Sequence, residues 1–169
     1  ACVVGVFGTV PSIVAHSSEL AAVGDFLVKQ LPNNEVILAR GADGRFGLAY
    51  GGDTFNTAVY LARAGLRVAY ATALGDDPYS QGILDLARTE GIDTGLVHIA
   101  PGRMPGLYLI ETTPDGERSF HYWRDRAPAR ELLDGPGAEA VITALGGASV
   151  VYLSGITLSL YAPSALDRL

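Results

Sequence analysis

The chain is poor in the residues that build disulfide-stabilised domains and nucleic-acid interfaces. Its 169 residues include one cysteine, Cys2, so neither an internal disulfide nor a site with several cysteine ligands can form. Lys29 is the only lysine, and acidic residues outnumber basic ones by 18 to 12. Proteins that bind nucleic acids need a basic surface. With a net charge of −6, this chain is not expected to have a nucleic-acid partner.

Several common catalytic motifs are also missing. The sequence contains no Gly-Lys-Ser/Thr phosphate loop, no G-x-S-x-G, no H-E-x-x-H and no G-x-G-x-x-G. The three histidines, His16, His98 and His121, are too far apart in the sequence to indicate a metal site. We therefore predict no metal ligands in this chain.

Two uncharged stretches resemble membrane segments only in length. Residues 1–18 are interrupted by Pro11, and no basic segment precedes them. Residues 140–166 contain three glycines and Pro163, which favours a buried strand between two helices. We expect no membrane partner.

Apolar residues recur with the spacing of alternating strands and helices. A helix is predicted over Asp53–Ala64, a strand over Val68–Leu74 and a second helix beginning near Asp77, where Pro78 suits a first turn. Strands are also predicted at Glu35–Ala39 and Arg45–Tyr50, a helix at residues 136–146 and a strand at Ser149–Leu153. This order predicts an α/β fold with a parallel sheet.

A β-hairpin interrupts this pattern. Residues 106–111 and 118–124 alternate partly between apolar and polar side chains, and Pro114-Asp115-Gly116 between them is a strong turn signal. Further on, residues 162–169 look like the beginning of a helix that nothing terminates, and the first residue is alanine. We expect the chain to be part of a longer protein.

The strongest functional signal is the run Gly51-Gly52-Asp53-Thr54-Phe55-Asn56. Two glycines allow the backbone to approach a ligand closely, and the following helix begins with unpaired N–H groups. Asp53, Thr54 and Asn56 add side chains that can bond vicinal hydroxyls. An ordinary helix cap made by Asp53 or Thr54 is an equally good interpretation of this spacing.

A second signal lies in the hairpin. Phe120, Tyr122 and Arg124 share one face of an alternating strand, and an arginine there could bind a carboxylate through two hydrogen bonds. Alone, this pattern favours a solvated hairpin with aromatic pairs across its strands.

Together these segments resemble the ribokinase-like carbohydrate kinases, and within them the bacterial subgroup that acts on 2-keto-3-deoxygluconate. The matching segments lie from about Arg40 onward. They are Gly51–Arg63, Thr72–Asp77, Pro105–Glu111, Gly116–Arg124 and Tyr152–Ile156. The resemblance implies a parallel sheet flanked by helices with a small β lid, here made of strands at about residues 27–50 and 105–124. The chain would form the N-terminal part of that fold.

The resemblance also implies the sugar site. It assigns Gly51, Gly52, Asp53 and Asn56 to the sugar hydroxyls. From the lid, Tyr108 and Arg124 would face the substrate.

The resemblance places two further residues at the same site. Arg103 is assigned to the keto-acid end of the substrate. Asp25, in the pair Gly24-Asp25, resembles the acidic residue that ends the family's first strand.

The family's catalytic base lies in a Gly-Ala-Gly-Asp motif, which this sequence lacks. The base, and most of the ATP and Mg²⁺ sites, are therefore expected outside the chain, which alone should be inactive. The expected full-length function is ATP-dependent phosphorylation of a small sugar acid, 2-keto-3-deoxygluconate. The alternatives are a fructokinase, another ribokinase-like sugar kinase, or a sugar-binding module without catalysis. The family also implies a homodimer formed through the lid, and the low cysteine content suits the cytoplasm.

Overall fold

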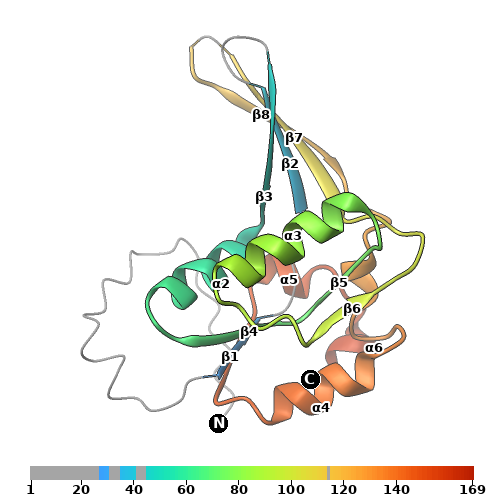
Figure 1. The fold of residues 1–169 in the computed structure, drawn as a ribbon. Coiled ribbons are helices and arrows are strands. Elements are labelled where there is room, and N and C mark those ends of the chain that lie inside the picture. Colours follow the sequence, from blue (N-terminus) through green and yellow to red (C-terminus); the bar gives the residue numbers. More distant parts are fainter. Residues whose placement is uncertain (1–26, 31–34, 41–44, 114) are drawn as a thin grey trace.

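The fold places a narrow β-sheet above a layered α/β body (Figure 1). The computed structural model describes residues 27–30, 35–40, 45–113 and 115–169. The strands are β1 (Leu27–Gln30), β2 (Glu35–Arg40), β3 (Phe46–Gly51), β4 (Arg67–Tyr70), β5 (Thr72–Leu74), β6 (Val97–Ile99), β7 (Gly106–Thr112), β8 (Arg118–Trp123) and β9 (Val150–Tyr152). The helices are α2 (Asp53–Arg63), α3 (Pro78–Thr89), the 3₁₀ turn η1 (Pro128–Glu131), α4 (Ala138–Gly146), α5 (Gly155–Leu158) and α6 (Pro163–Leu166).

The body is built from parallel strands, as the sequence predicts. β4, β1 and β9 form one parallel sheet in that order, and β5 pairs with β6 in a second. Within the described ranges, no helix is long and apolar enough to cross a bilayer. The α/β class with a parallel sheet is confirmed.

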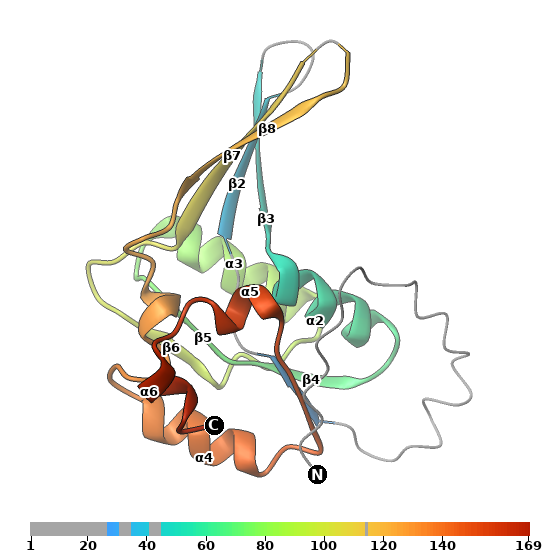
Figure 2. The same ribbon diagram turned by 180° about the vertical axis from the view of Figure 1, so that it is seen from behind.

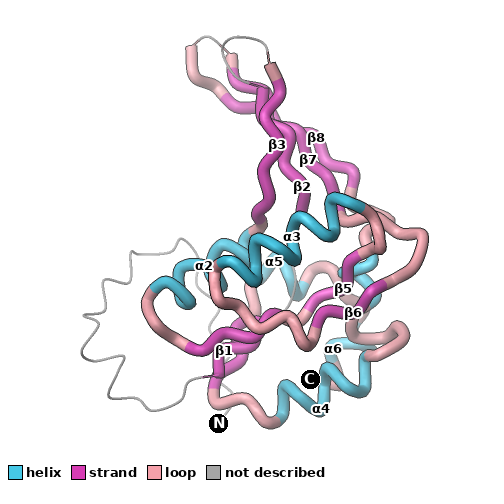
Figure 3. Tube along the Cα trace, in the orientation of Figure 1, coloured by secondary structure: helices cyan, strands magenta, loops and turns pink. Residues whose placement is uncertain are grey.

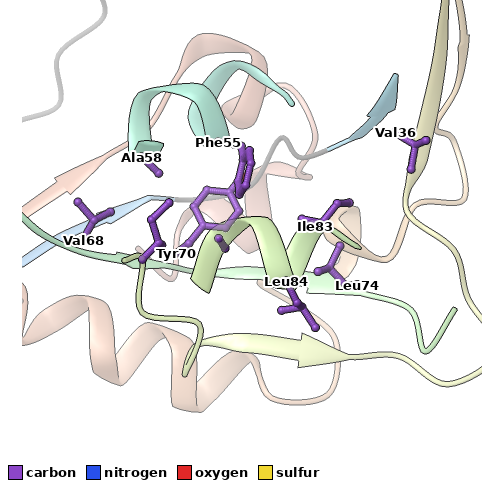
Figure 4. Close-up of a cluster of buried hydrophobic side chains, with 10 residues drawn as sticks. Val36, Phe55, Ala58, Val68, Tyr70, Leu74, Ile83 and Leu84 are labelled. Carbon is purple, nitrogen blue, oxygen red and sulfur yellow. The ribbon is translucent and has the colours of Figure 1, made fainter. Parts of the chain in front are cut away.

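Two buried clusters fill the space on either side of β4 and β5. Val68, Tyr70 and Leu74 pack with residues of α2 and α3, and Figure 4 shows the Phe55 and Tyr70 rings meeting edge to face. The intervening Ala71 and Ala73 pack with η1, α4 and α6 instead. Side chains of the apolar run 68–74 therefore point alternately to two sides, and each side packs against a different set of helices. Figure 2 shows α4 and α6 at the end of the body that is distant from the projecting sheet.

The two helices predicted in the first half are present, and only one of them has a side-chain cap at its N-terminus. Asp77 caps α3 by accepting hydrogen bonds from the backbone N–H groups of Tyr79 and Ser80, at 2.9 and 3.2 Å. The residue that precedes α2 is Gly52, which makes no side-chain cap. An ordinary cap by Asp53 or Thr54 is therefore wrong, because both residues lie inside the helix.

The projecting sheet, which we call the lid, contains β3, β2, β7 and β8 in that order (Figure 3). β7 and β8 form the predicted antiparallel hairpin, and β2 and β3 form another. β2 runs parallel to β7 and joins the hairpins edge to edge. Four strands from two distant segments thus make one sheet.

The structure corrects two of the predicted strands. Residues 27–30 are not part of the lid: they pair with β4 and β9 in the body. The expected strand Val68–Leu74 is divided after Tyr70, because its first half pairs with β1 and its second half with β6. Asp25 lies outside the described residues.

Candidate functional site

A row of four residues crosses the base of the lid. Strand register places Glu35 of β2 between Gly51 of β3 and Gly106 of β7. Arg124 follows the last residue of β8 and continues the row on the other side of Gly106. Neighbouring strands lie about 4.8 Å apart, so the row brings the diglycine segment and Arg124 to one face of the sheet.

The two glycines suit this geometry, and the backbone conformation at Gly52 favours glycine. A Cβ atom on Gly51 would lie 2.9 Å from Cδ1 of Ile37 and 3.3 Å from Oδ1 of Asn56. Gly52 has φ of 145°, a conformation that other residues rarely adopt. The chain can therefore pass directly from β3 into α2, with the side chain of Asn56 next to Gly51. The helix N-terminus at this point favours oxygen-rich ligands.

Arg124 is paired with the buried carboxylate of the same row. Its Nη1 atom lies 3.5 Å from Oε1 of Glu35, and its guanidinium lies 4.4 Å from the ring centre of Tyr122. A Cβ atom on Gly106 would lie 3.1 Å from Cβ of Arg124 and 3.2 Å from both Cγ and Oε1 of Glu35. Glycine at position 106 thus gives the two side chains room to meet.

Burial changes the titration of two groups on this face. Glu35 is only 5% exposed, and burial raises the pKa of its carboxyl, while the charge of Arg124 opposes that rise. Burial also raises the pKa of the Tyr108 hydroxyl, and the nearby Glu35 adds to the effect. Both shifts indicate a partly desolvated site, in which electrostatic contacts are stronger than in water.

Aromatic rings cover the lid face above the row. The ring centre of Tyr108 lies 5.7 Å from that of Tyr122 and 6.4 Å from that of Phe120. Phe120 and Tyr122 stack with an interplanar angle of 9°. The expected solvated hairpin with paired aromatics is therefore present, and the same rings line the face that carries Arg124.

The structure does not bring Arg103 to this row. Its guanidinium contacts the Glu131 carboxylate at 3.0 and 3.3 Å and donates to the carbonyl of Arg126 at 2.8 Å. The hydrogen bonds to Glu131 also raise the pKa of Arg103. Arg103 and Arg124 line one open cavity of about 590 Å³ beside the lid base. Within that cavity, the Arg103 guanidinium is already bound by the Glu131 carboxylate and the Arg126 carbonyl.

The Thr72–Asp77 segment, singled out in the sequence, has structural contacts. Gly75 lies against the backbone of Arg103, where a Cβ atom would come within 1.7 Å of the carbonyl oxygen. Asp76 accepts a hydrogen bond from the N–H of Gly102 at 2.8 Å, and Asp77 caps α3. The segment therefore fixes the loop that leads into β7.

Of the expected site residues, Gly51, Gly52, Asp53 and Asn56 lie together at the lid base, with Tyr108 and Arg124 on the same sheet face. Their assignment to a bound sugar remains a prediction. Sequence reasoning missed Glu35, which begins an apolar strand. Only the strand pairing of Glu35 with Gly51 and Gly106 could have indicated that it belongs to the site.

The described residues contain no group of three or more His, Cys, Asp or Glu side chains arranged to hold a metal ion. The two acidic residues of the site lie on different elements: Glu35 on β2 and Asp53 on α2. The carboxylate of Glu35 forms an ion pair with Arg124. The residues described at the lid base therefore form no cluster of three metal-ligating side chains.

Curated proteins of similar sequence include several sugar kinases. The chain is 40% identical over 157 residues to the 2-dehydro-3-deoxygluconokinase of Escherichia coli K12, and 37% identical over 157 residues to that of Dickeya dadantii. These alignments cover 90% of this chain and 48% of each relative. More distant relatives include fructokinase-2 of Solanum habrochaites, 28% identical over 144 residues. The chain spans about half the length of the curated relatives it matches.

Solved structures have the same fold. A 2-dehydro-3-deoxygluconokinase from Thermotoga maritima superposes with a TM-score of 0.69 and 25% identity, covering 84% of this chain and 45% of that one. A PfkB protein from Polaromonas sp. JS666 gives a TM-score of 0.72 at 22% identity, covering 85% and 50%. The profile described as pfkB family carbohydrate kinase matches residues 19–169. With its glycine-bounded lid base and ribokinase-like architecture, this chain belongs to the pfkB family of carbohydrate kinases.

Proposed function

We propose that the full-length protein transfers the γ-phosphoryl group of ATP to 2-keto-3-deoxygluconate. The 40% identity to 2-dehydro-3-deoxygluconokinases supports the reaction class. The observation that favours a sugar acid over a neutral sugar is Arg124, which lies in one row with Gly51 at the lid base. A guanidinium can bind a carboxylate through two parallel hydrogen bonds, which a neutral ketose cannot match.

The residues of this chain would bind and orient the sugar. Gly51, Gly52, Asp53 and Asn56 would contact its hydroxyls, using backbone N–H groups at the start of α2 and two polar side chains. The lid would contribute Tyr108 and Arg124 and cover the sugar. Positioning and exclusion of water lower the barrier to phosphoryl transfer.

We assign the base that deprotonates the hydroxyl, and the ATP and Mg²⁺ sites, to parts of the full-length protein outside this chain. ATP supplies the phosphoryl group, and Mg²⁺ offsets phosphate charge in such reactions. The described residues contain no group of three or more His, Cys, Asp or Glu side chains that could hold a metal ion. Because residues 1–169 lack the Gly-Ala-Gly-Asp motif, we expect this part alone not to transfer phosphoryl groups. A requirement for ATP also favours the cytoplasm as the location.

The proposal is tested by the turnover of the purified full-length protein. With ATP and Mg²⁺, kcat/KM for 2-keto-3-deoxygluconate should exceed that for fructose by at least about tenfold. That factor corresponds to one charge-assisted contact, roughly 1.5–3 kcal/mol. Comparable kcat/KM values for the two sugars would contradict the assignment of a sugar acid as substrate. Absence of turnover with either sugar would contradict the assignment as a kinase.

A fructokinase is the second candidate, and one contact favours it. Arg124 already has Glu35 as a carboxylate partner, as expected of an arginine that supports the lid rather than binding a substrate acid. The fructokinase relatives are less similar, at 28% identity. The alternative of a sugar-binding module without catalysis predicts sugar binding and no turnover in the same experiment.

We also propose that two copies pair through the lids. The lid face opposite the Glu35 row carries Phe46, Leu48 and Trp123, which are 55%, 50% and 59% exposed. Leu38, Leu107 and Leu109 line a shallow apolar groove between Phe46 and Trp123. Apolar side chains grouped on one projecting sheet are typical of surfaces that another molecule covers (Figure 1).

Light scattering of the full-length protein tests this pairing. The parent should have the mass of a dimer, and Leu48→Asp should shift it toward the monomer because a charge cannot be buried there without a partner. Tyr60→Asp, an equally apolar-to-acidic change at an exposed position of α2, is the matched control and should stay dimeric. A monomeric parent at high concentration contradicts the proposal.

A further inference from the structure

Strand register places the carboxylate of Glu35 in the same row as the guanidinium of Arg124 at the lid base. Glu35 lies between two glycines, so no neighbouring side chain in its own row separates it from Arg124. Its side chain is 7% exposed, against 33% for that of Arg124. A nearly buried acid beside a partly open arginine marks an oriented pair.

We propose that Glu35 is a positioning residue that holds Arg124 for the substrate carboxylate. This inference rests on the proposed function of the same site. Glu35 contacts Nη1 of Arg124 from the floor of the site, at 3.5 Å, and Tyr122 lies against the guanidinium, at 4.4 Å. These two contacts restrain the position of the guanidinium. The remaining N–H groups of Arg124 are then available to a carboxylate that enters from the open side.

The space at Gly106 and a general entropy argument support an orienting role. Gly106 leaves room for both side chains, since a Cβ atom there would crowd each of them at 3.1–3.2 Å. An arginine that must find its own geometry loses side-chain entropy when it binds, whereas a restrained one has already lost it. Glu35 would therefore affect binding of the acid through Arg124, without touching the substrate.

The test is steady-state kinetics of the full-length enzyme with 2-keto-3-deoxygluconate. Glu35→Ala should raise KM for the acid roughly tenfold with a smaller change in kcat, and Glu35→Gln, which keeps a hydrogen-bond acceptor, should recover part of that loss. In an Arg124→Ala background, neither substitution should raise KM further, because Glu35 acts only through Arg124. A purely structural role would give additive effects instead.

Glu90→Ala is the matched control. It removes a carboxylate from another arginine pair, Arg63–Glu90, at the far end of α2. Its KM for the acid should stay within about twofold of the parent. Melting temperatures of all variants identify any that fail to fold, and Glu35→Gln, similar in volume to the parent side chain, remains informative if Glu35→Ala does not fold.

Crystal structures of the parent and Glu35→Ala read the orientation directly, whichever sugar the enzyme uses. The guanidinium of Arg124 should lie over Tyr122 in the parent and leave that position in the variant. An unmoved Arg124, or a lower KM for the acid in Glu35→Gln, would overturn the inference while leaving the kinase intact. A parent that does not phosphorylate the acid would overturn the proposed function, and the crystal structures would still decide whether Glu35 orients Arg124.

Discussion

The hydroxyl groups of Thr54 and Tyr70 lie 3.0 Å apart in the interior, directly behind the diglycine segment. Thr54 is the second residue of α2, and Tyr70 is the last residue of β4. The bond therefore ties the start of the helix that carries Asn56 to the central sheet. Because both residues are almost completely buried, the position of the candidate sugar site is set from the core.

Removing one of these hydroxyls should weaken the fold and the site together. Tyr70→Phe deletes the bond to Thr54 without opening a large cavity, so we expect a loss of about 0.5–1.5 kcal/mol in unfolding free energy. Denaturant unfolding of the full-length protein measures it. Tyr79→Phe, at an exposed position of α3, is the control and should be neutral. Equal losses in the two variants would contradict the anchoring role.

The contact between Gly75 and the backbone of Arg103 predicts a strong effect of one methyl group. In Gly75→Ala, the new Cβ would meet a carbonyl oxygen at 1.7 Å, and backbone cannot rotate away as a side chain can. Overpacking of this kind costs about 1–3 kcal/mol. The displaced loop leads into β7, so kcat/KM should also fall.

Gly146→Ala is the matched control for that substitution. Gly146 ends α4, and no heavy atom outside its chain neighbours and its own helix backbone lies within 4 Å of the position of its added Cβ. Alanine in a helix is favoured over glycine by roughly 0.5–1 kcal/mol. Calorimetry should therefore give a lower Tm for Gly75→Ala and an equal or higher Tm for Gly146→Ala. The same direction in both would show that crowding at Arg103 is not the cause.

Local signals predicted most elements of this fold, whereas the central pair of the site depends on distant pairing. The cap at Asp77 and the turn before Arg118 act within a few residues, so α3 and the β7–β8 hairpin could be expected. The position of Glu35 depends on the parallel register of β2 with β7, which no local motif specifies. The division between β4 and β5 has the same origin, because the two strands have different partners.

Burial of Glu35 predicts a dependence of stability on pH. Its folded-state pKa is raised above the ordinary value of 4.5, mainly by desolvation, with Arg124 acting in the opposite direction. The folded state therefore holds this proton more tightly than the unfolded state does. The stability that Glu35 contributes is fully present below pH 4.5 and is lost as the pH rises through the raised pKa.

Glu35→Gln removes this titration and makes the prediction measurable. The Tm of the parent minus that of the variant should decrease as the pH rises above 4.5. For Glu131→Gln the difference should instead decrease as the pH falls below 4.5, because hydrogen bonds from Arg103 lower the pKa of Glu131 and its contribution is lost at low pH. A parent-minus-variant difference for Glu35 that increases with pH would mean that pairing with Arg124 outweighs desolvation.

The last prediction separates the two candidate substrates at Arg124. If Arg124 binds the acid of 2-keto-3-deoxygluconate, Arg124→Ala removes a charge-assisted contact worth roughly 1.5–3 kcal/mol, so kcat/KM for the acid should fall about ten- to hundredfold. Arg124→Lys should recover only part of this loss, because lysine keeps the charge but lacks the planar pair of donors. For fructose the change should be small.

Arg124→Ala leaves the buried carboxylate of Glu35 without its partner, and an unpaired buried charge destabilises the fold. The experiment therefore needs a control for this loss of stability. The double variant Glu35→Gln/Arg124→Ala removes both charges and should regain Tm without regaining activity toward the acid. Selectivity is therefore read from the ratio of kcat/KM for the two sugars, which unfolding lowers equally. A ratio that is the same in parent and variants would show that Arg124 supports the lid, and the fructokinase function would then be favoured.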